Sequence, residues 1–587
     1  MNPHNCSNKF KRSILYTSVA LGMLGTPYYA SAQDTNVEEV VVTGSYIRRS
    51  EGIIAASPIT TLSADDLVAQ GTLNMAQVVQ NMTFNNGSGV TNSIQASGAS
   101  SNSAAFNLRG LGTRATLQLI DGKRVTNPNV QWLLPSIAIQ QMDIVTDGAA
   151  ALYGTDAVAG VVNILPYKSY EGLKIEHFNE EDSRGDFRDQ TTSFLWGKDL
   201  GGGVDIVAAG SFRHNGTLHW TDRPKLALAG LTDNSGANPS NWNVPQRDDN
   251  GALLGTTKST PDPICGTDPV TDPLVQGGNK FGTLALGRCW FPFADTRDFV
   301  EQKTQASLYS NINWEVNEDL SLTGQVLWGR WQGHGRQNQG NPGTRFGDLP
   351  TVRGELPGNP FRAVAGDGRE LFAQPLLDGN GMILSDPYGN QQPLRDANGA
   401  VVLAGNQFAN ITNDPNGGVP FNEDVPFSSA WLPFGLANTN PAIFGGPDSD
   451  QISRKENDER DMRLAFGADF TVPYLDGWEG SATYMFGQRN VVSAQTQHFS
   501  FSAVEQGLNC DQVRDAGACF NPFGAADNSP MRTPQAVADA IYTRDRVDNK
   551  DTLQTFDLVI NGTIAPGGFE LPGGTIGAAF GYQRRDE

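Results

Sequence analysis

The sequence has 587 residues, of which 38% are hydrophobic, and its formal net charge is −21 at pH 7. The 63 Asp and Glu residues against 42 Lys and Arg argue against a nucleic-acid-binding protein, which would carry a basic surface. The 66 glycines and 33 prolines favour many turns and long loops. This composition excludes collagen, a coiled coil and a bundle of membrane helices, and it favours an all-β protein.

The first 32 residues are typical of a cleaved export signal. A basic segment precedes an apolar run over residues 14–24, and residues 30–32, Ala-Ser-Ala, supply the small-x-small pattern that a signal peptidase needs. The alternative, a helical membrane anchor, is disfavoured because about eleven apolar residues are too few to cross a ~30 Å hydrocarbon layer. We therefore predict a signal peptide over residues 1–32 and an exported mature protein.

The four cysteines after the signal fall into two near pairs, Cys265 with Cys289 and Cys510 with Cys519. Each pair lies in a polar stretch rich in Gly and Pro, so we expect two loop-closing disulfides in an oxidising compartment. A metal site is the competing interpretation. It is disfavoured because neither pair has a two-residue spacing and no histidine lies near either pair. We predict no metal site and no cofactor.

Residues 51–168 have a mixed helix and strand pattern. Ser63 with Asp66 three residues later is typical of a capping box that opens a helix, and a second short helix is expected over residues 73–82. Four strands are expected, the second of them ending in an Asp-Gly turn, over residues 106–109, 116–120, 142–146 and 161–165. These elements predict a compact α+β domain.

Long strands with strict alternation follow from residue 169 onward. In one of them Leu308 and Ile312 share one face, while Ser307 and Asn311 share the other. We count about nine such strands, several of them longer than the ~5 or 6 residues of a globular strand, and strands of this length suit a bilayer. A soluble antiparallel sandwich would also alternate, since it has one buried and one wet face. Aromatic residues near the strand ends favour the membrane, where their rings suit the interfaces.

The loops between these strands have very unequal lengths. The long ones cover residues 221–300, 339–457 and 498–548, and the tight ones lie near residues 200–203, 317–321 and 474–478. Short turns on the periplasmic side and long loops outside are typical of outer-membrane barrels. In the longest loop, Asp378 and Asp396 each open an Asp-x-Asn-Gly turn, which predicts small hairpins.

Two weak motif matches do not indicate an enzyme. Residues 110–115 match a GxGxxA dinucleotide-binding string, but a strand follows where that motif requires a helix. Residues 246–251 half-resemble a calcium loop, yet a glutamine stands at its first ligand position, so a plain Asx turn is expected. No Ser/His/Asp or Cys/His arrangement has a supporting context. We therefore expect no catalytic residues.

The segment before the mixed domain resembles a TonB box. It is a β-prone run in the 33–50 region, formed by Val37, Glu38, Glu39, Val40, Val41, Val42, Thr43 and Gly44. A free strand of this kind can add to an exposed sheet edge of a periplasmic protein through main-chain hydrogen bonds. An ordinary first strand of the mixed domain is the alternative interpretation.

The mixed domain itself resembles the plug of TonB-dependent outer-membrane receptors. The likeness lies in residues 107–112, 119–125 and 142–164, and its motif positions are Arg109, Gly110, Gly112, Asp121, Gly122, Tyr153, Gly154, Gly160 and Asn163. In this order and spacing the match is specific over residues 37–165, whereas the later strands match only in their pattern.

The resemblance implies a membrane all-β fold, with the α+β plug inside a transmembrane antiparallel β-barrel of about 22 strands, of which about nine are present. The implied domains are the signal peptide over 1–32, the TonB box and linker over 33–50, the plug over 51–168 and a partial barrel with long extracellular loops over 169–587. Because nine strands would leave an open sheet edge in lipid, we expect a chain truncated at its C-terminus.

The implied function is that of a receptor and transporter in the outer membrane of a Gram-negative bacterium. It would bind a bulky extracellular nutrient, such as an oligosaccharide or a siderophore, and release it into the periplasm. The implied partners are outer-membrane lipid and TonB, which the ExbB and ExbD complex energises with the proton gradient. No nucleic acid is expected. The alternative is a secreted or surface-attached β-rich carbohydrate-binding protein without transport activity.

Overall fold

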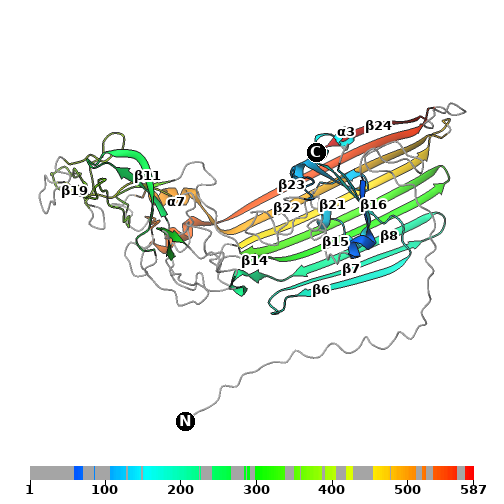
Figure 1. Cartoon of the computed structure of the whole chain (residues 1–587), viewed down its shortest axis with the longest axis horizontal. Coiled ribbons are helices and arrows are strands. Elements are labelled where there is room, and N and C mark those ends of the chain that lie inside the picture. Colours follow the sequence, from blue (N-terminus) through cyan, green and yellow to red (C-terminus); the bar gives the residue numbers. More distant parts are fainter. Residues whose placement is uncertain are drawn as a thin grey trace, which may run out of the picture. The chain divides into compact units, whose positions relative to one another are not determined.

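The structure is a computed structural model (Figure 1). It describes residues 59–69, 85, 106–126, 130–146, 150–223, 225, 241–265, 283–285, 287–290, 298–336, 350–356, 358–385, 391–404, 418–427, 454–475, 477–510, 519–523, 533–564 and 576–587. The predicted signal peptide, the TonB box and the helix predicted over residues 73–82 lie outside these ranges.

The mixed domain is built on a five-stranded sheet with the strand order β1-β4-β5-β2-β3. Its strands are β1 (Ile59–Ser63), β2 (Thr116–Ile120), β3 (Lys123–Arg124), β4 (Ile139–Val145) and β5 (Gly160–Pro166). Strands β2 and β5 are parallel, and the other neighbours are antiparallel. The helices are α1 (Ala64–Ala69) and α3 (Ala150–Tyr153), with 3-10 turns η2 (Thr113–Ala115), η3 (Val130–Trp132), η4 (Ser136–Ala138) and η5 (Gly154–Ala157).

The start of α1 confirms the predicted capping box. The backbone N–H of Ser63 donates to Asp66 Oδ2 at 2.9 Å, and the backbone N–H of Asp66 donates to Ser63 Oγ at 3.2 Å. Each side chain thereby satisfies a backbone donor that the first helical turn leaves free. The local pattern was sufficient here because all of the partners lie within three residues.

The strand predicted over residues 106–109 is wrong. Leu108 forms a single bridge with Asn85 and no ladder. The backbone then leaves the extended region, because Arg109 and Gly110 have φ values of 57° and 71°. Three further predicted strands are confirmed as β2, β4 and β5 with slightly different ends.

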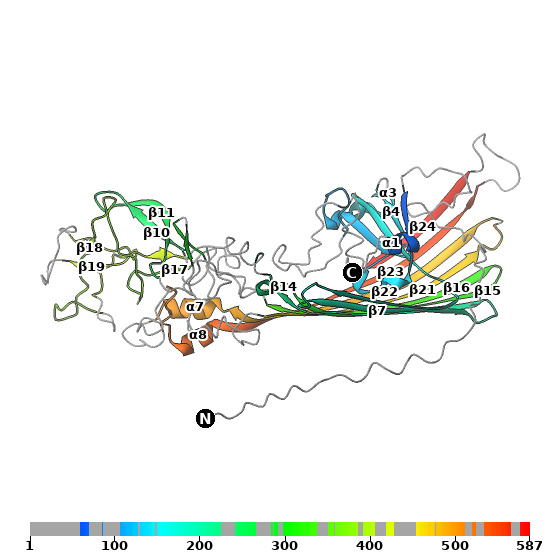
Figure 2. The same cartoon turned by 60° about the horizontal axis from the view of Figure 1, so that its bottom comes forward.

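The long alternating strands form one antiparallel sheet of nine strands, as expected (Figure 1). In sheet order they are β6 (Gly172–Glu181), β7 (Arg188–Asp199), β8 (Val204–Asn215), β15 (Gln302–Asn317), β16 (Leu320–Arg336), β21 (Arg454–Thr471), β22 (Glu479–Phe499), β23 (Tyr542–Thr563) and β24 (Gly577–Asp586). Figure 2 shows that this sheet, called the wall below, is curved.

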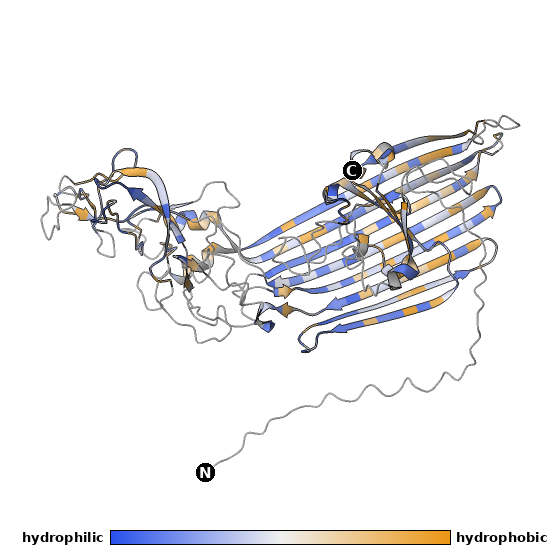
Figure 3. Ribbon diagram, viewed as in Figure 1, coloured by the Kyte–Doolittle hydropathy of each residue, from blue (hydrophilic) through white to orange (hydrophobic). Residues whose placement is uncertain are grey.

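The wall has an inverted polarity. On β15, Leu308 is 51% exposed and Ile312 is 46% exposed, whereas Ser307 and Asn311 are 1% and 0% exposed. Figure 3 shows the same alternation of polar and apolar residues along the neighbouring strands. A water-soluble sheet buries its apolar face, so this arrangement contradicts a soluble sandwich. An apolar outer face is what a sheet in lipid requires.

The three long loops, which run from β8 to β15, from β16 to β21 and from β22 to β23, contain shorter elements. These are β9 (Leu218–His219), η6 (Trp220–Asp222), β10 (Asn241–Arg247), β11 (Leu253–Pro261), β12 (Thr283–Ala285), β13 (Arg288–Trp290), β14 (Asp298–Val300), β17 (Thr351–Val352), β18 (Phe372–Ala373), β19 (Val419–Pro420), β20 (Val425–Pro426), α7 (Phe501–Leu508) and α8 (Gln535–Ile541). None of the helices in the described ranges is long and apolar enough to cross a membrane.

The predicted Asp-x-Asn-Gly hairpins are confirmed in the longest loop. The backbone N–H of Asp378 donates to the carbonyl of Met382, and that of Asp396 donates to the carbonyl of Ala400, both at 2.8 Å. The expected Asx turn near residue 250 has the same form, since Asp248 Oδ1 accepts backbone N–H groups two and four residues later. The repeated use of Asp and Gly explains why these turns could be read from the sequence.

The three long loops share one hydrophobic core. The loop core, defined by its buried members, consists of Trp242, Val352, Leu356, Phe361, Val425, Phe427, Val504, Leu508, Phe520, Phe523 and Ile541. Trp242 from the first loop lies 5.4 Å from the ring of Phe427 in the second and 4.4 Å from that of Phe523 in the third. The described loop segments therefore pack into one module, which we call the loop module.

Candidate functional site: the interface between plug and wall

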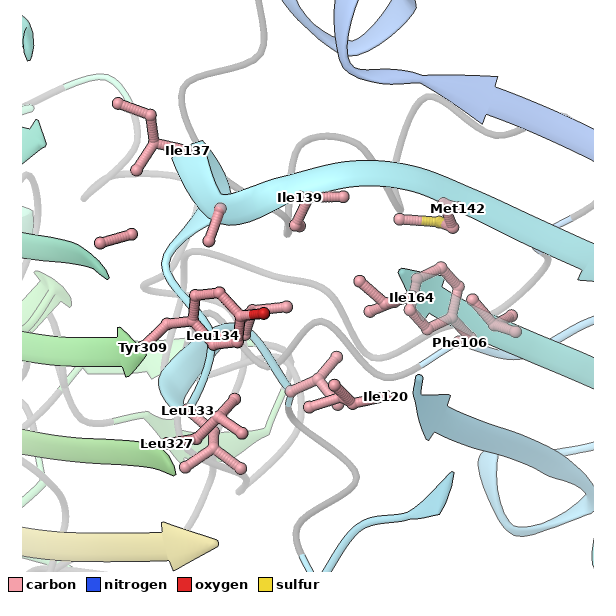
Figure 4. Close-up of a cluster of buried hydrophobic side chains, with 14 of the residues drawn as sticks. Phe106, Ile120, Leu133, Leu134, Ile137, Ile139, Met142, Ile164, Tyr309 and Leu327 are labelled. Atoms are coloured by element: carbon pink, nitrogen blue, oxygen red, sulfur yellow. The ribbon is translucent and has the colours of Figure 1, made fainter. Parts of the chain in front are cut away.

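The mixed domain packs directly on the polar, inward face of the wall. One continuous cluster of buried side chains contains Ile120, Leu133 and Leu134 from the mixed domain together with Tyr309 and Leu327 from the wall. Figure 4 shows these side chains gathered in one buried cluster. The few apolar residues on the otherwise polar inward face thus form the seat of the mixed domain.

Polar wall residues bind backbone groups at the ends of the mixed-domain strands. The hydroxyl of Tyr309 donates to the carbonyl of Tyr167 at 2.8 Å, just after β5. The buried Arg463 donates from Nη2 to the carbonyl of Ile120, the last residue of β2, at 3.1 Å, and from Nη1 to Gln325 Oε1. Hydrogen bonds from a charged donor hold buried carbonyls that would otherwise be unsatisfied.

Ion pairs add to this interface. Lys123 Nζ in β3 lies 3.5 Å from Asp557 Oδ2 on β23. Lys168 Nζ lies 3.2 Å from Asp121 Oδ1, so the segment that leads into the wall is tied back to the turn after β2. The contacts at this interface thus combine apolar packing with hydrogen bonds and ion pairs.

Three of the motif residues form and hold one turn of the mixed domain. They are Asp121, Gly122 and Asn163. Asp121 and Gly122 have φ values of 51° and 72°, which make the tight turn between β2 and β3. Asn163 Oδ1 on β5 accepts the N–H of Gly122 at 2.8 Å and fixes that turn.

Gly160 and Tyr153 also build junctions. Gly160, at φ 137°, lies so close to the carbonyl of Val145 that a Cβ would collide with it. The carbonyl of Tyr153 accepts Arg124 Nη2 at 2.9 Å, while Arg124 Nη1 pairs with Asp156 at 2.7 Å.

The remaining motif positions lie in turns. Gly112 has a φ of 103°, and its N–H donates to Asn107 Oδ1 at 2.7 Å. Arg109 and Gly110 form the bend described above, and Gly154, at φ 77°, opens η5. The structure therefore gathers the motif residues at turns and strand junctions of a single domain.

Both cysteine pairs are disulfide-bonded in the structure. Cys265 and Cys289 have a Cα–Cα distance of 5.9 Å, and Cys510 and Cys519 one of 5.3 Å. The second bridge lies close to the loop core, because it joins the residues that follow α7 to Cys519, which precedes the buried Phe520. Within the described residues no group of His, Cys, Asp and Glu could hold a metal ion.

Two arginines form ion pairs that connect segments of the loop module. Arg247 Nε donates to Glu423 Oε1 at 2.6 Å and joins the first long loop to the second. Arg395 donates to Glu355 at 2.6 and 2.7 Å and also contacts Asp424. Burial alone would raise the pKa of Glu355, but the hydrogen bonds and the positive charge of Arg395, together with a backbone hydrogen bond and the charge of Arg353, outweigh burial and lower that pKa below its usual value. The same contacts raise the pKa of Arg395 in spite of burial.

Sequence reasoning did not identify the wall residues of this interface. The alternation placed Arg463 and Asn311 on the polar face, but it gave no sign that Arg463 and Tyr309 contact the mixed domain. The available signal was the occurrence of large charged or aromatic residues at inward positions in the middle of a long strand.

A sheet with an apolar outer face and a folded domain seated on its polar inner face defines a plugged β-barrel protein of the outer membrane. Residues 54–161 match the family model described as the TonB-dependent receptor plug domain. Residues 54–161 are therefore a plug domain of the TonB-dependent receptor type, and the protein is located in the outer membrane of a Gram-negative bacterium.

Curated relatives agree with this assignment. The chain is 27% identical over 177 residues to the iron-regulated outer membrane virulence protein of Vibrio cholerae. The matched segment covers 28% of this chain and 25% of the relative. It is 28% identical over 201 residues to the ferrienterobactin receptor of Escherichia coli, covering 30% and 25%. It is 27% identical to the vitamin B12 transporter of Vibrio vulnificus, covering 25% and 24%. The matches thus span about a quarter of each relative's length.

Solved structures were also found. A ferric enterobactin receptor mutant of Pseudomonas aeruginosa in complex with enterobactin has a TM-score of 0.35 and 10% identity, over 90% of this chain and 58% of that one. The siderophore receptor PirA of the same organism has a TM-score of 0.29 and 10% identity, over 88% and 66%.

Proposed function

We propose that the protein takes up a bulky nutrient, such as a siderophore or an oligosaccharide, across the outer membrane. The observation that supports this most strongly is the folded plug seated on the polar face of the wall, held by Tyr309, Arg463 and the shared apolar cluster. A passive pore has no need of such a domain, whereas a receptor that releases cargo on demand does. The names of the relatives, a ferrienterobactin receptor and a vitamin B12 transporter, favour a metal-containing cargo.

We further propose TonB, energised by ExbB and ExbD, as the periplasmic partner. Its binding segment would be the run Val37, Glu38, Glu39, Val40, Val41, Val42, Thr43 and Gly44, within the 33–50 linker that precedes the plug over 51–168. The consecutive β-branched side chains over residues 40–43 suit a strand that adds to a sheet edge. Force applied to this segment would act on the plug while the wall stays in lipid.

Replacing Val41 by Pro tests this partner. Proline removes a backbone donor from the added strand, so we expect energised uptake to be abolished while cell-surface ligand binding stays unchanged. Val41→Thr keeps the N–H and the β-branch and is the matched control, which should transport normally. Uptake of the radiolabelled nutrient that supports growth is the measurement. Wild-type uptake by the Val41→Pro receptor would contradict the assignment.

A further inference from the structure

One aromatic contact joins the plug to the wall. Trp132, in η3 of the plug, stacks on Trp331 of β16 with ring centroids 4.9 Å apart and planes 10° from parallel. Both indoles are buried, at 3% and 2% exposure. The next two plug residues, Leu133 and Leu134, belong to the cluster that contains Tyr309 and Leu327 of the wall. Residues 130–134 thus form a peg at the wall.

The wall makes room for this peg at a glycine, Gly329. Gly329 lies two residues before Trp331 and therefore on the same inward face of β16. A Cβ on Gly329 would collide with the carbonyl group of Trp132 and would come within 3.1 Å of Leu133 Cα. Any larger residue at this position would push the peg away from the wall, because the obstacle is backbone rather than a flexible side chain.

A buried cation reinforces the wall side of the stack. Lys303 Nζ on the neighbouring strand β15 lies over the Trp331 ring, 5.7 Å from its centroid, and 3.3 Å from Glu301 Oε1. Trp331 lies opposite Gln305 and Glu459 in the sheet, so it is supported from both neighbouring strands. The wall half of the contact is therefore held by residues of the wall itself.

The stack also carries a cost. Trp331 Nε1 is buried and has no hydrogen-bond partner among the residues that the structure describes. A buried donor without an acceptor loses its hydration and gains nothing in return. When the peg withdraws, water reaches this N–H and satisfies it. The contact is thus favoured by the buried area of the two indoles and opposed by the unpaired N–H of Trp331.

We propose that Trp132, seated on Trp331 and Gly329, is a latch that keeps the plug closed against the wall in the resting receptor. The latch sets how often the peg leaves the wall, and hence how readily large hydrophilic solutes pass the plug. This inference does not rest on the identity of the cargo or on TonB, because it concerns the resting state.

Antibiotic susceptibility tests the latch in cells that express the full receptor. Trp331→Ala removes the stack and Gly329→Ala wedges the peg outward. An aromatic pair contributes about 0.5–1.5 kcal/mol beyond area burial, so loss of the stack should raise the open population about two- to thirteenfold. We expect a matching fall in the inhibitory concentration of vancomycin, a large hydrophilic antibiotic, in a strain that lacks TonB.

Matched controls lie on the same strand. Trp328→Ala removes an indole from the opposite face of β16, and Gly324→Ala adds a methyl group where no atom lies within 4 Å. Both should leave susceptibility unchanged. Trp331→Phe retains a ring and deletes the unpaired N–H, so it should be as tight as the wild type or tighter.

Receptor amount and heat-dependent gel migration in isolated outer membranes show whether each variant is inserted. Should Trp331→Ala fail to insert, Trp132→Leu weakens the same stack from the plug side and leaves the wall intact, and the same fall is expected. Wild-type susceptibility with normally inserted Gly329→Ala and Trp132→Leu receptors would overturn the latch, as would an equal fall in the two controls.

Discussion

At the scale of single residues, the interface depends on a few positions where the wall departs from a plain polar lining. Arg463 and Tyr309 reach plug carbonyls, and Gly329 makes room for plug backbone. When one partner of a buried, charged hydrogen bond is removed, the other partner is left unsatisfied. The resulting loss of stability is larger than the net free energy that the bond contributes. These positions therefore control how the plug is held, although they form a small part of the buried area.

Glu355 gives the loop module a pH dependence. Its folded-state pKa lies below the ordinary value of 4.5 because Arg395 favours the charged form against burial. The contribution of the pair to stability is thus fully present above the unfolded pKa and is lost as pH falls through the folded one. We expect limited proteolysis of the loops in the purified receptor to rise as pH falls below about 4.5.

Two variants check that expectation. Glu355→Gln should lose this acid-dependent step and show raised cleavage already at neutral pH. Glu370→Gln, an exposed carboxylate in the same loop, is the control and should keep the step. A wild-type proteolysis profile in the Glu355→Gln receptor would show that the pair does not hold the module.

At the scale of elements, the inverted polarity of the wall decides which substitutions a strand tolerates. Leu308 is exposed at the middle of β15, and we predict that Leu308→Lys impairs insertion by about 2–4 kcal/mol, because a charge then meets hydrocarbon. Asn313→Lys places the same charge on the inward face of the same strand, opposite Asp205, and should be inserted normally. Folding into lipid vesicles, followed by gel migration, measures both. Equal insertion of the two variants would contradict the proposed lipid face.

The same scale shows what could be predicted from the sequence. The capping box at Ser63 and the Asp378 and Asp396 hairpins depend on partners a few residues apart, so local chemistry was sufficient. The nine strands were predictable because a period of two is repeated over many residues. The strand predicted over 106–109 failed because the apolar pattern of Phe106 and Leu108 reflects burial in the plug core, while Arg109 and Gly110 leave the extended conformation.

Contacts between distant segments were beyond the sequence. Nothing in the alternation indicates that Trp331 meets Trp132, some two hundred residues earlier in the chain, or that Arg247 pairs with Glu423. Such pairs depend on the arrangement of whole strands, not on local periodicity. The TonB box differs again, since its assignment rests on resemblance and remains a prediction.

At the scale of the whole molecule, two shared hydrophobic cores organise the structure. The plug and the wall share one buried cluster, and the three long loops share another, the loop core. Because side chains from all three loops complete the loop core, we expect the loops to fold as one unit rather than as independent flaps. A ligand would then meet a largely preformed surface, which reduces the ordering cost of binding.

The central claim is that the wall has one face in lipid and the other against the plug. Single spin labels at Leu308 and Ile312, and at Ser307 and Asn311, test it in the full receptor in a bilayer. The account predicts that the first two labels collide with oxygen dissolved in lipid, and that the second two are shielded from both oxygen and a water-soluble quencher. Labels at Leu308 and Ile312 that meet the water-soluble quencher, or labels at Ser307 and Asn311 that meet lipid oxygen, would contradict it.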